Sequence, residues 1–118
     1  MFASNFTVRD THFEHARGRD RLKQFSQSQT IASGKAMTNY FCDNCGTLMY
    51  RVAERFPGLS ILRIGTVDDF SLHETALRPR QEHWTRHRVC WFTGVQGDDV
   101  ETWEGQGGGR GGRRASAM

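Results

Sequence analysis

Two cysteines separated by two residues, and followed at once by a glycine, lie between two extended runs of the chain. The segment reads Tyr40-Phe41-Cys42-Asp43-Asn44-Cys45-Gly46-Thr47. A tight turn can direct both thiolates at one ion, and glycine adopts the positive φ that turns backbone N–H groups toward the sulfurs. Because one extended run leads into the turn and another leads out of it, this pattern predicts a zinc knuckle.

The residues after the pair bear on the choice between metal and redox chemistry. A thioredoxin-like pair opens a helix, whereas residues 47–53 alternate as a strand, with Leu48, Tyr50 and Val52 on one face. The alternation favours zinc, and a redox dithiol at the two cysteines is an alternative.

A closed structural zinc site takes four ligands, so Cys42 and Cys45 need two more. The other cysteine and histidine residues are Cys90, His12, His15, His73, His83 and His87. His83 and His87 can share an ion on a helix, but four residues of strand span about 13 Å. Because residues 81–92 are expected to be extended, this pair is predicted to be solvated surface. The sequence thus supplies half of a zinc site.

The net charge of +3 comes from the end of the chain. Residues 105–118 hold six of the 13 glycines, no acidic residue and the arginines Arg110, Arg113 and Arg114. Residues 1–104 are formally neutral, so we expect no broad nucleic-acid surface there. The composition predicts one domain over residues 1–104 and a disordered Gly/Arg tail over residues 105–118.

The chain shows no transmembrane or secretory segment. No run of about 18 apolar residues is present, and residues 1–10 lack a basic segment followed by an apolar one. We therefore expect a cytoplasmic, reducing location, in which the three cysteines form no structural disulfide.

Short extended runs separated by turns predict an all-β domain. Residues 59–67 are the most apolar run and are expected to form the central strand. A Ser-x-x-Glu capping box at Ser71 and Glu74 predicts one or two helical turns. Strands are expected at residues 2–8, 22–28, 36–41, 47–53, 59–67 and 81–92.

Four segments together resemble a known family. Ile31-Ala32-Ser33-Gly34 and residues 39–48 resemble the second half of glutathione-dependent formaldehyde-activating (GFA) domains, the centromere-protein-V-like group, and fungal members in particular. Phe2-Ala3-Ser4-Asn5-Phe6-Thr7-Val8 resembles the strand after that family's first cysteine block. Ile64-Gly65-Thr66-Val67-Asp68-Asp69 resembles its strand and turn, and residues 82–91 its closing Glu…Arg-Val-x-Trp segment.

The resemblance implies a zinc-supported all-β fold and carbon–sulfur lyase chemistry that joins glutathione to formaldehyde as S-hydroxymethylglutathione. It implies a structural zinc held by Cys42, Cys45 and an N-terminal Cys-x-Cys element. It also implies a catalytic zinc held by a Cys-x-Cys-x-x-Cys block just ahead of the Phe2 strand. We expect an N-terminally truncated family domain with impaired activity, because this sequence contains neither block. Cys90 aligns with a position that is usually Ser, so it is not expected to replace a ligand.

Other polar pairs have structural interpretations. Asp68 and Asp69 are expected to form a solvated turn, and Glu82 and Arg88 a structural ion pair. The expected partner is a small thiol adduct of the glutathione type. The alternative function is a zinc-knuckle binding module whose Gly/Arg tail, with its single Arg110-Gly111-Gly112 unit, contacts RNA or an acidic partner.

Overall fold

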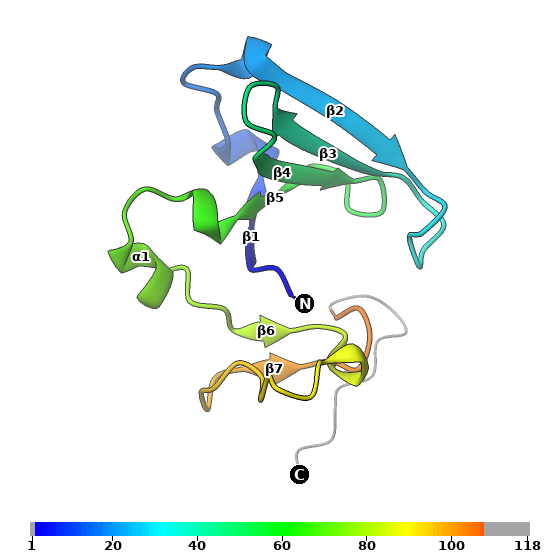
Figure 1. The fold of residues 1–118 in the computed structure, drawn as a ribbon, viewed down its shortest axis with the longest axis vertical. Helices are drawn as coiled ribbons and strands as arrows, with labels where there is room; N and C mark the ends of the chain where they lie inside the picture. Colours follow the sequence, from blue (N-terminus) through cyan, green and yellow to red (C-terminus); the bar gives the residue numbers. More distant parts are fainter. Residues whose placement is uncertain (1, 108–118) are drawn as a thin grey trace.

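The computed structural model describes residues 2–107, in which seven strands form two sheets (Figure 1). The larger sheet is five-stranded and antiparallel throughout, with the order β1-β5-β4-β3-β2, and the smaller one pairs β6 with β7 in parallel. The strands are β1 (Asn5–Arg9), β2 (Leu22–Gln27), β3 (Met37–Cys42), β4 (Leu48–Ala53), β5 (Leu59–Arg63), β6 (Gln81–Glu82) and β7 (Glu101–Thr102).

Helical structure in the described part of the chain is limited to single turns. No helix within residues 2–107 is long and apolar enough to span a bilayer. The expected β class is confirmed in that the described residues are mostly β with few helical turns. The helical segments are η1 (Asp10–His12), η2 (Arg19–Arg21), η3 (Ile64–Thr66), α1 (Ser71–Glu74) and η4 (Thr85–His87).

The apolar run expected as the central strand forms a shorter strand away from the centre. β5 ends at Arg63 and continues as η3, and β4 is the middle strand of the sheet. The Thr66 hydroxyl donates to the Arg63 carbonyl at 2.8 Å, and this bond closes the turn that ends the strand. Apolar composition alone does not predict such a turn.

The capping box at Ser71 and Glu74 is also corrected. Ser71 is the first residue of α1 and makes no cap for it. The Asp69 carboxylate instead accepts hydrogen bonds from the Ser71 N–H at 3.0 Å and the Ser71 hydroxyl at 2.6 Å. Asp68 and Asp69 thus lie in the expected turn. The Asp69 carboxylate in it binds Ser71, the first residue of α1.

The long extended run expected over residues 81–92 is wrong. Only β6 is extended, and Trp84 then takes the left-handed conformation, with φ 60°. Trp84 donates its N–H to the Gly105 carbonyl at 2.9 Å, and Thr85 donates to the Trp103 carbonyl at 3.0 Å. These partners lie about twenty residues further along the chain, so local alternation did not show the turn.

The sheet has a small core centred on Tyr50. Among the described residues only three apolar side chains are buried, those of Tyr50, Ala53 and Ile64. The Tyr50 ring stacks on Tyr40 at 4.5 Å between centroids and meets the edge of Phe13 at 5.1 Å. Its hydroxyl lies 3.0 Å from His15 Nε2. These contacts fasten the β1–β2 connection to one face of the sheet.

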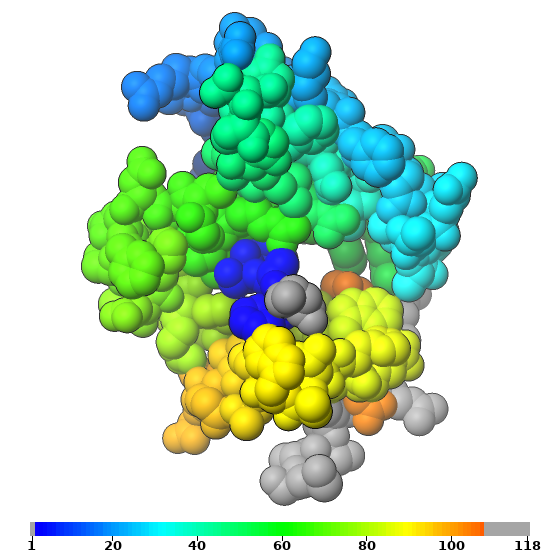
Figure 2. Space-filling model, viewed as in Figure 1, coloured from blue at the N-terminus to red at the C-terminus, as the bar shows by residue number. Residues whose placement is uncertain are grey.

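Figure 2 shows the described residues as an upper body containing the five-stranded sheet and a lower one containing residues near β6 and β7. Phe2, just ahead of β1, stacks on Phe92 of the lower body at 4.4 Å between ring centroids. Packed structure continues to Gly107, which is buried against Trp103. The remaining residues of the predicted tail, 108–118, which include Arg110, lie outside the described residues.

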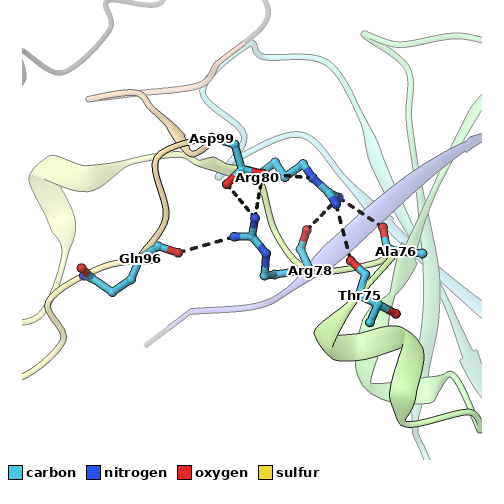
Figure 3. Close-up of polar contacts among 6 residues, drawn as sticks. All are labelled: Thr75, Ala76, Arg78, Arg80, Gln96 and Asp99. Carbon is cyan, nitrogen blue, oxygen red and sulfur yellow. Dashed lines mark hydrogen bonds and ion pairs between the residues drawn. The ribbon is translucent and has the colours of Figure 1, made fainter.

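Two arginines join the α1 region to the loop before β7 (Figure 3). Arg78 forms a bidentate pair with Asp99 at 2.6 and 2.7 Å, and Arg80 lies 3.4 Å from the same carboxylate. Arg80 also donates to the carbonyls of Thr75, Ala76 and Arg78. The Arg80 guanidinium thus binds the carbonyls of the segment that follows α1, while the Arg78 guanidinium binds Asp99 in the loop before β7.

A second ion pair has the least exposed acidic group of the four pairs in the described residues. Arg88 donates to Glu82 at 2.8 Å, which confirms the expected pair, and the Val95 N–H donates to the same carboxylate at 3.1 Å. Gly94 lies so close that a Cβ there would be 2.8 Å from both partners. Although burial alone would raise the pKa of Glu82, the two hydrogen bonds and the Arg88 charge lower it below its usual range.

We expect Glu82→Gln to lower the free energy of unfolding at neutral pH by about 1–2 kcal/mol, because Arg88 loses its charged partner. The Glu82 side chain is only 12% exposed, so solvent screens the pair weakly. Since the folded pKa is depressed, the pair contributes fully above the unfolded pKa of about 4.3 and is lost as the pH falls through the folded value. Urea unfolding across this pH range measures the difference. Glu14→Gln, at an exposed loop position, is the control, and a difference that persists unchanged at low pH would contradict the assignment.

Candidate metal centre at the cysteine turn

The two cysteines lie on a closed hairpin turn between β3 and β4. The Gly46 N–H donates to the Cys42 carbonyl at 2.8 Å, and the Cys42 N–H donates to the Thr47 carbonyl at 2.9 Å. Gly46 has φ +75°, the conformation that glycine takes most readily. The strand–turn–strand form predicted for a knuckle is therefore present, and the element directly after Cys45 is the strand β4.

Both thiols are free, with Cys42 half-buried and Cys45 exposed. Cys45 Sγ lies 3.1 Å from Thr47 Oγ1. Hydrogen bonds from the Thr47 hydroxyl, the Thr47 N–H and the Cys42 thiol lower the pKa of Cys45. The turn therefore brings two sulfurs together and stabilises the thiolate form, which is the form that binds metals.

A backbone hydrogen bond and an ion pair connect the cysteine turn to the β1–β2 connection. The Asp43 N–H donates to the Arg21 carbonyl at 2.9 Å. The side chains of the same residues form an ion pair at 3.0 Å, with that of Arg21 60% exposed and that of Asp43 23% exposed. An ion pair this exposed adds little free energy, so the backbone bond is the firmer anchor. Asp43 is thus occupied as a structural group.

The other predicted ligand candidates do not converge on the cysteine turn. His12 bonds with Thr11, His15 with Tyr50, and His73 with the Val67 carbonyl. Cys90 is exposed beyond η4. Within residues 2–107 no three Cys, His, Asp or Glu side chains are grouped to hold a metal ion.

His83 and His87 have different environments. His87 is exposed, as predicted, but His83 is half-buried and accepts hydrogen bonds at Nδ1 from Gln106 at 3.1 Å and from the Gly107 N–H at 3.3 Å. Burial lowers the pKa of His83. The prediction of a solvated pair is corrected for His83, whose partners come from the glycine-rich segment assigned to a tail.

The cysteine turn fits one half of a tetrahedral zinc site. Cys42 and Cys45 offer two thiolates from one turn, which is the spacing that structural zinc sites use. Thr47 was missed from the sequence. The signal for it is a hydroxyl residue two positions after the second cysteine, where its side chain can return to the sulfur.

The model of one protein family, described as GFA: Glutathione-dependent formaldehyde-activating enzyme, matches residues 1–87. The match contains the turn, both cysteines and the whole five-stranded sheet. The chain belongs to the GFA family. Searches of curated proteins and of solved structures found no match.

Membership of the GFA family relates the cysteine turn to a known type of chemistry. The GFA family is named for glutathione-dependent activation of formaldehyde and is generally zinc-binding. Within this GFA protein, Glu82 lies inside the matched range, whereas its partner Arg88 and β7 lie beyond it. The lower body is thus built from both matched and unmatched residues.

We expect Gly46→Ala to lower the free energy of unfolding by about 1–2 kcal/mol, because alanine is strained at positive φ. A Cβ at Gly46 meets no atom within 4 Å, so backbone strain and not a clash causes the loss. Gly46→Asn should cost less, since asparagine tolerates this conformation better. Thermal and urea unfolding of both variants measure the effect, and equal stabilities would contradict it.

Proposed function

We propose that this protein is a zinc-dependent carbon–sulfur lyase of the GFA type that acts on glutathione–aldehyde adducts, with Cys42 and Cys45 as half of its structural zinc site. The observation that carries the proposal is the closed turn between β3 and β4, which holds Cys42 and Cys45 within one hairpin connection closed at Gly46. The family match supports the substrate class. Zinc with an open coordination position supplies Lewis-acid polarisation of a carbonyl or a bound thiolate.

Cysteines placed ahead of β1 are suited to completing the structural site. Asn5, the first residue of β1, pairs with Arg63. In β4, Tyr50 pairs with Leu62, so the start of β1 lies at the same end of the sheet as the cysteine turn. Two interstrand spacings, about 10 Å, separate β1 from β4. Because Phe2 stacks on Phe92, a segment ahead of Phe2 has to return along the sheet to reach the turn.

Cys42 and Cys45 alone supply two of the four ligands that a tetrahedral zinc ion takes. We propose that the 118-residue chain binds zinc weakly and turns over slowly, and that an upstream cysteine-bearing segment raises both properties. We further propose a reducing, cytoplasmic location, which is supported by the free state of Cys42, Cys45 and Cys90.

The experiment compares this chain with one extended ahead of Phe2 by a Cys-x-Cys element and a Cys-x-Cys-x-x-Cys block. Bound zinc is measured by mass spectrometry under native conditions, and activity by formation of S-hydroxymethylglutathione. We expect the extended chain to hold zinc stoichiometrically and to be active. Cys42→Ser or Cys45→Ser in it should weaken zinc binding at least ~10-fold, as removal of a thiolate ligand from a tetrahedral site implies.

Cys90→Ser is the matched control, because Cys90 is an exposed free thiol away from the turn. Zinc content and activity should be unchanged in this variant. Tight stoichiometric zinc and full activity in the unextended chain would refute the half-site. Zinc binding that survives both Cys42→Ser and Cys45→Ser in the extended chain would refute the role of the turn.

A further inference from the structure

A cleft of about 620 Å³ lies between the large sheet and the segment that follows β6. Its sheet side is formed by the ends of β3 and β4, and the β2–β3 connection and the turn after β4 form its rim. Across from them lie Trp84 and His87. Figure 2 shows the cyan β2–β3 connection and the yellow-green segment after β6, which flank this space. The volume is in the range of small-molecule sites.

The charge lining the cleft is of one sign. Lys35 of the β2–β3 connection, Arg51 of β4 and Arg55 of the turn after β4 line it, and none of its described lining residues is Asp or Glu. Within residues 2–107 no ion pair joins any of these three cations to a carboxylate. The nearby Glu54 carboxylate accepts the Ala36 N–H at 3.1 Å, on the strand edge.

Neutral groups orient the arginines of this sheet face. Arg51 donates from Nε to the Asn39 carboxamide oxygen at 2.8 Å, directly across β3 and β4. Arg63, on the neighbouring strand, donates to the Asn5 carboxamide oxygen at 3.0 Å. Burial lowers the pKa of Arg63, and the charge of Arg51 lowers it further. The Arg51 guanidinium is therefore held in place while its charge stays uncompensated, as an anion-binding group requires.

Aromatic rings supply an apolar surface beside these cations. Phe56, after β4, and Trp84, after β6, both line the cleft. Trp84 is the only described residue other than glycine with positive φ. Its N–H bond to Gly105 holds that conformation. The guanidinium of Arg86 lies 5.4 Å from the Trp84 ring centroid, which adds positive charge on that side. Residues other than glycine in the left-handed conformation cluster at active sites and ligand clamps.

We propose that this cleft binds a small organic molecule that carries at least two negative charges, from carboxylate or phosphate groups, together with an apolar portion. Lys35 lies on the β2–β3 connection, and the two arginines lie on or just after β4. The three cations can therefore bind two or more separate negative charges of one ligand. The apolar portion packs between Phe56 and Trp84. The Arg51 fork donates to an anionic oxygen, and Lys35 and Arg55 attract the remaining charge at the rim.

The cleft is separate from the cysteine turn. Residues at the start of β3 line the cleft, whereas Cys42 ends the same strand, about 17 Å away along it. Ligand binding here does not require zinc at the turn, so the cleft can be tested apart from the zinc half-site; only if S-methylglutathione is the probe that binds does the inference rest on the proposed function.

The test is isothermal titration calorimetry on the full chain at low and moderate salt, with three separate probes. S-methylglutathione presents carboxylates and has no free thiol for a metal, AMP presents phosphate with a planar base, and inorganic phosphate is the simple ion. We expect one organic probe to bind more tightly than inorganic phosphate, with affinity falling as salt rises. Which probe binds identifies the source of the anionic groups.

Variants locate the binding. Arg51→Gln should weaken the bound probe about 10-fold or more, and Arg51→Lys should recover part of the loss, because it keeps the charge without the fork. Lys35→Gln, at an exposed rim position, should weaken it about 3-fold. Arg17→Gln, at an exposed position between η1 and η2, is the control and should have no effect. Thermal unfolding checks that each variant is folded.

Three results would overturn the proposal. The first is that neither organic probe binds. The second is that both bind no better than inorganic phosphate, which would mean an adventitious ion only. The third is that Arg51→Gln binds as the parent does. If Arg51→Gln fails to fold, Lys35→Gln and Arg55→Gln decide, and unchanged affinity in both would refute the cleft.

Discussion

The ring of Tyr50 connects the middle strand of the sheet to the connection that covers one of its faces. It is one of only three buried apolar side chains in the described part of the chain, and it contacts Tyr40, Phe13 and His15. Burial raises the pKa of Tyr50 above its usual range. With so little apolar surface removed from water, the fold relies on its strand ladders and on this single aromatic cluster.

Polar contacts replace apolar packing in the lower body. Arg80 satisfies three carbonyls after α1, and Glu82 accepts from Arg88 and from the backbone of Val95. These bonds order a region with only two short strands, β6 and β7. A metal ion at Cys42 and Cys45 would serve the upper body in a similar way, because cross-linking a turn compensates for a small core.

Local pattern predicted most of the sheet and the cysteine turn, since alternation and a glycine after the second cysteine are properties of neighbouring residues. It did not predict where β5 ends or how Trp84 turns, because those depend on Thr66 and on Gly105, and the latter lies far along the chain. The cleft also could not be predicted from the sequence. Lys35, Arg51 and Arg55 are unremarkable in a chain with 16 basic residues, and they become a group only when strand pairing places them around one space.

The outer edge of β2 has consequences for how the protein behaves at high concentration. β2 is a terminal strand of the sheet, and Phe25 on it is 59% exposed. An unpaired strand edge with an exposed aromatic ring is a template for strand-to-strand association between molecules. Lys23, two residues away on the same face, places a charge that repels an identical edge. The charge of Lys23 thus opposes the association of two molecules through this strand edge.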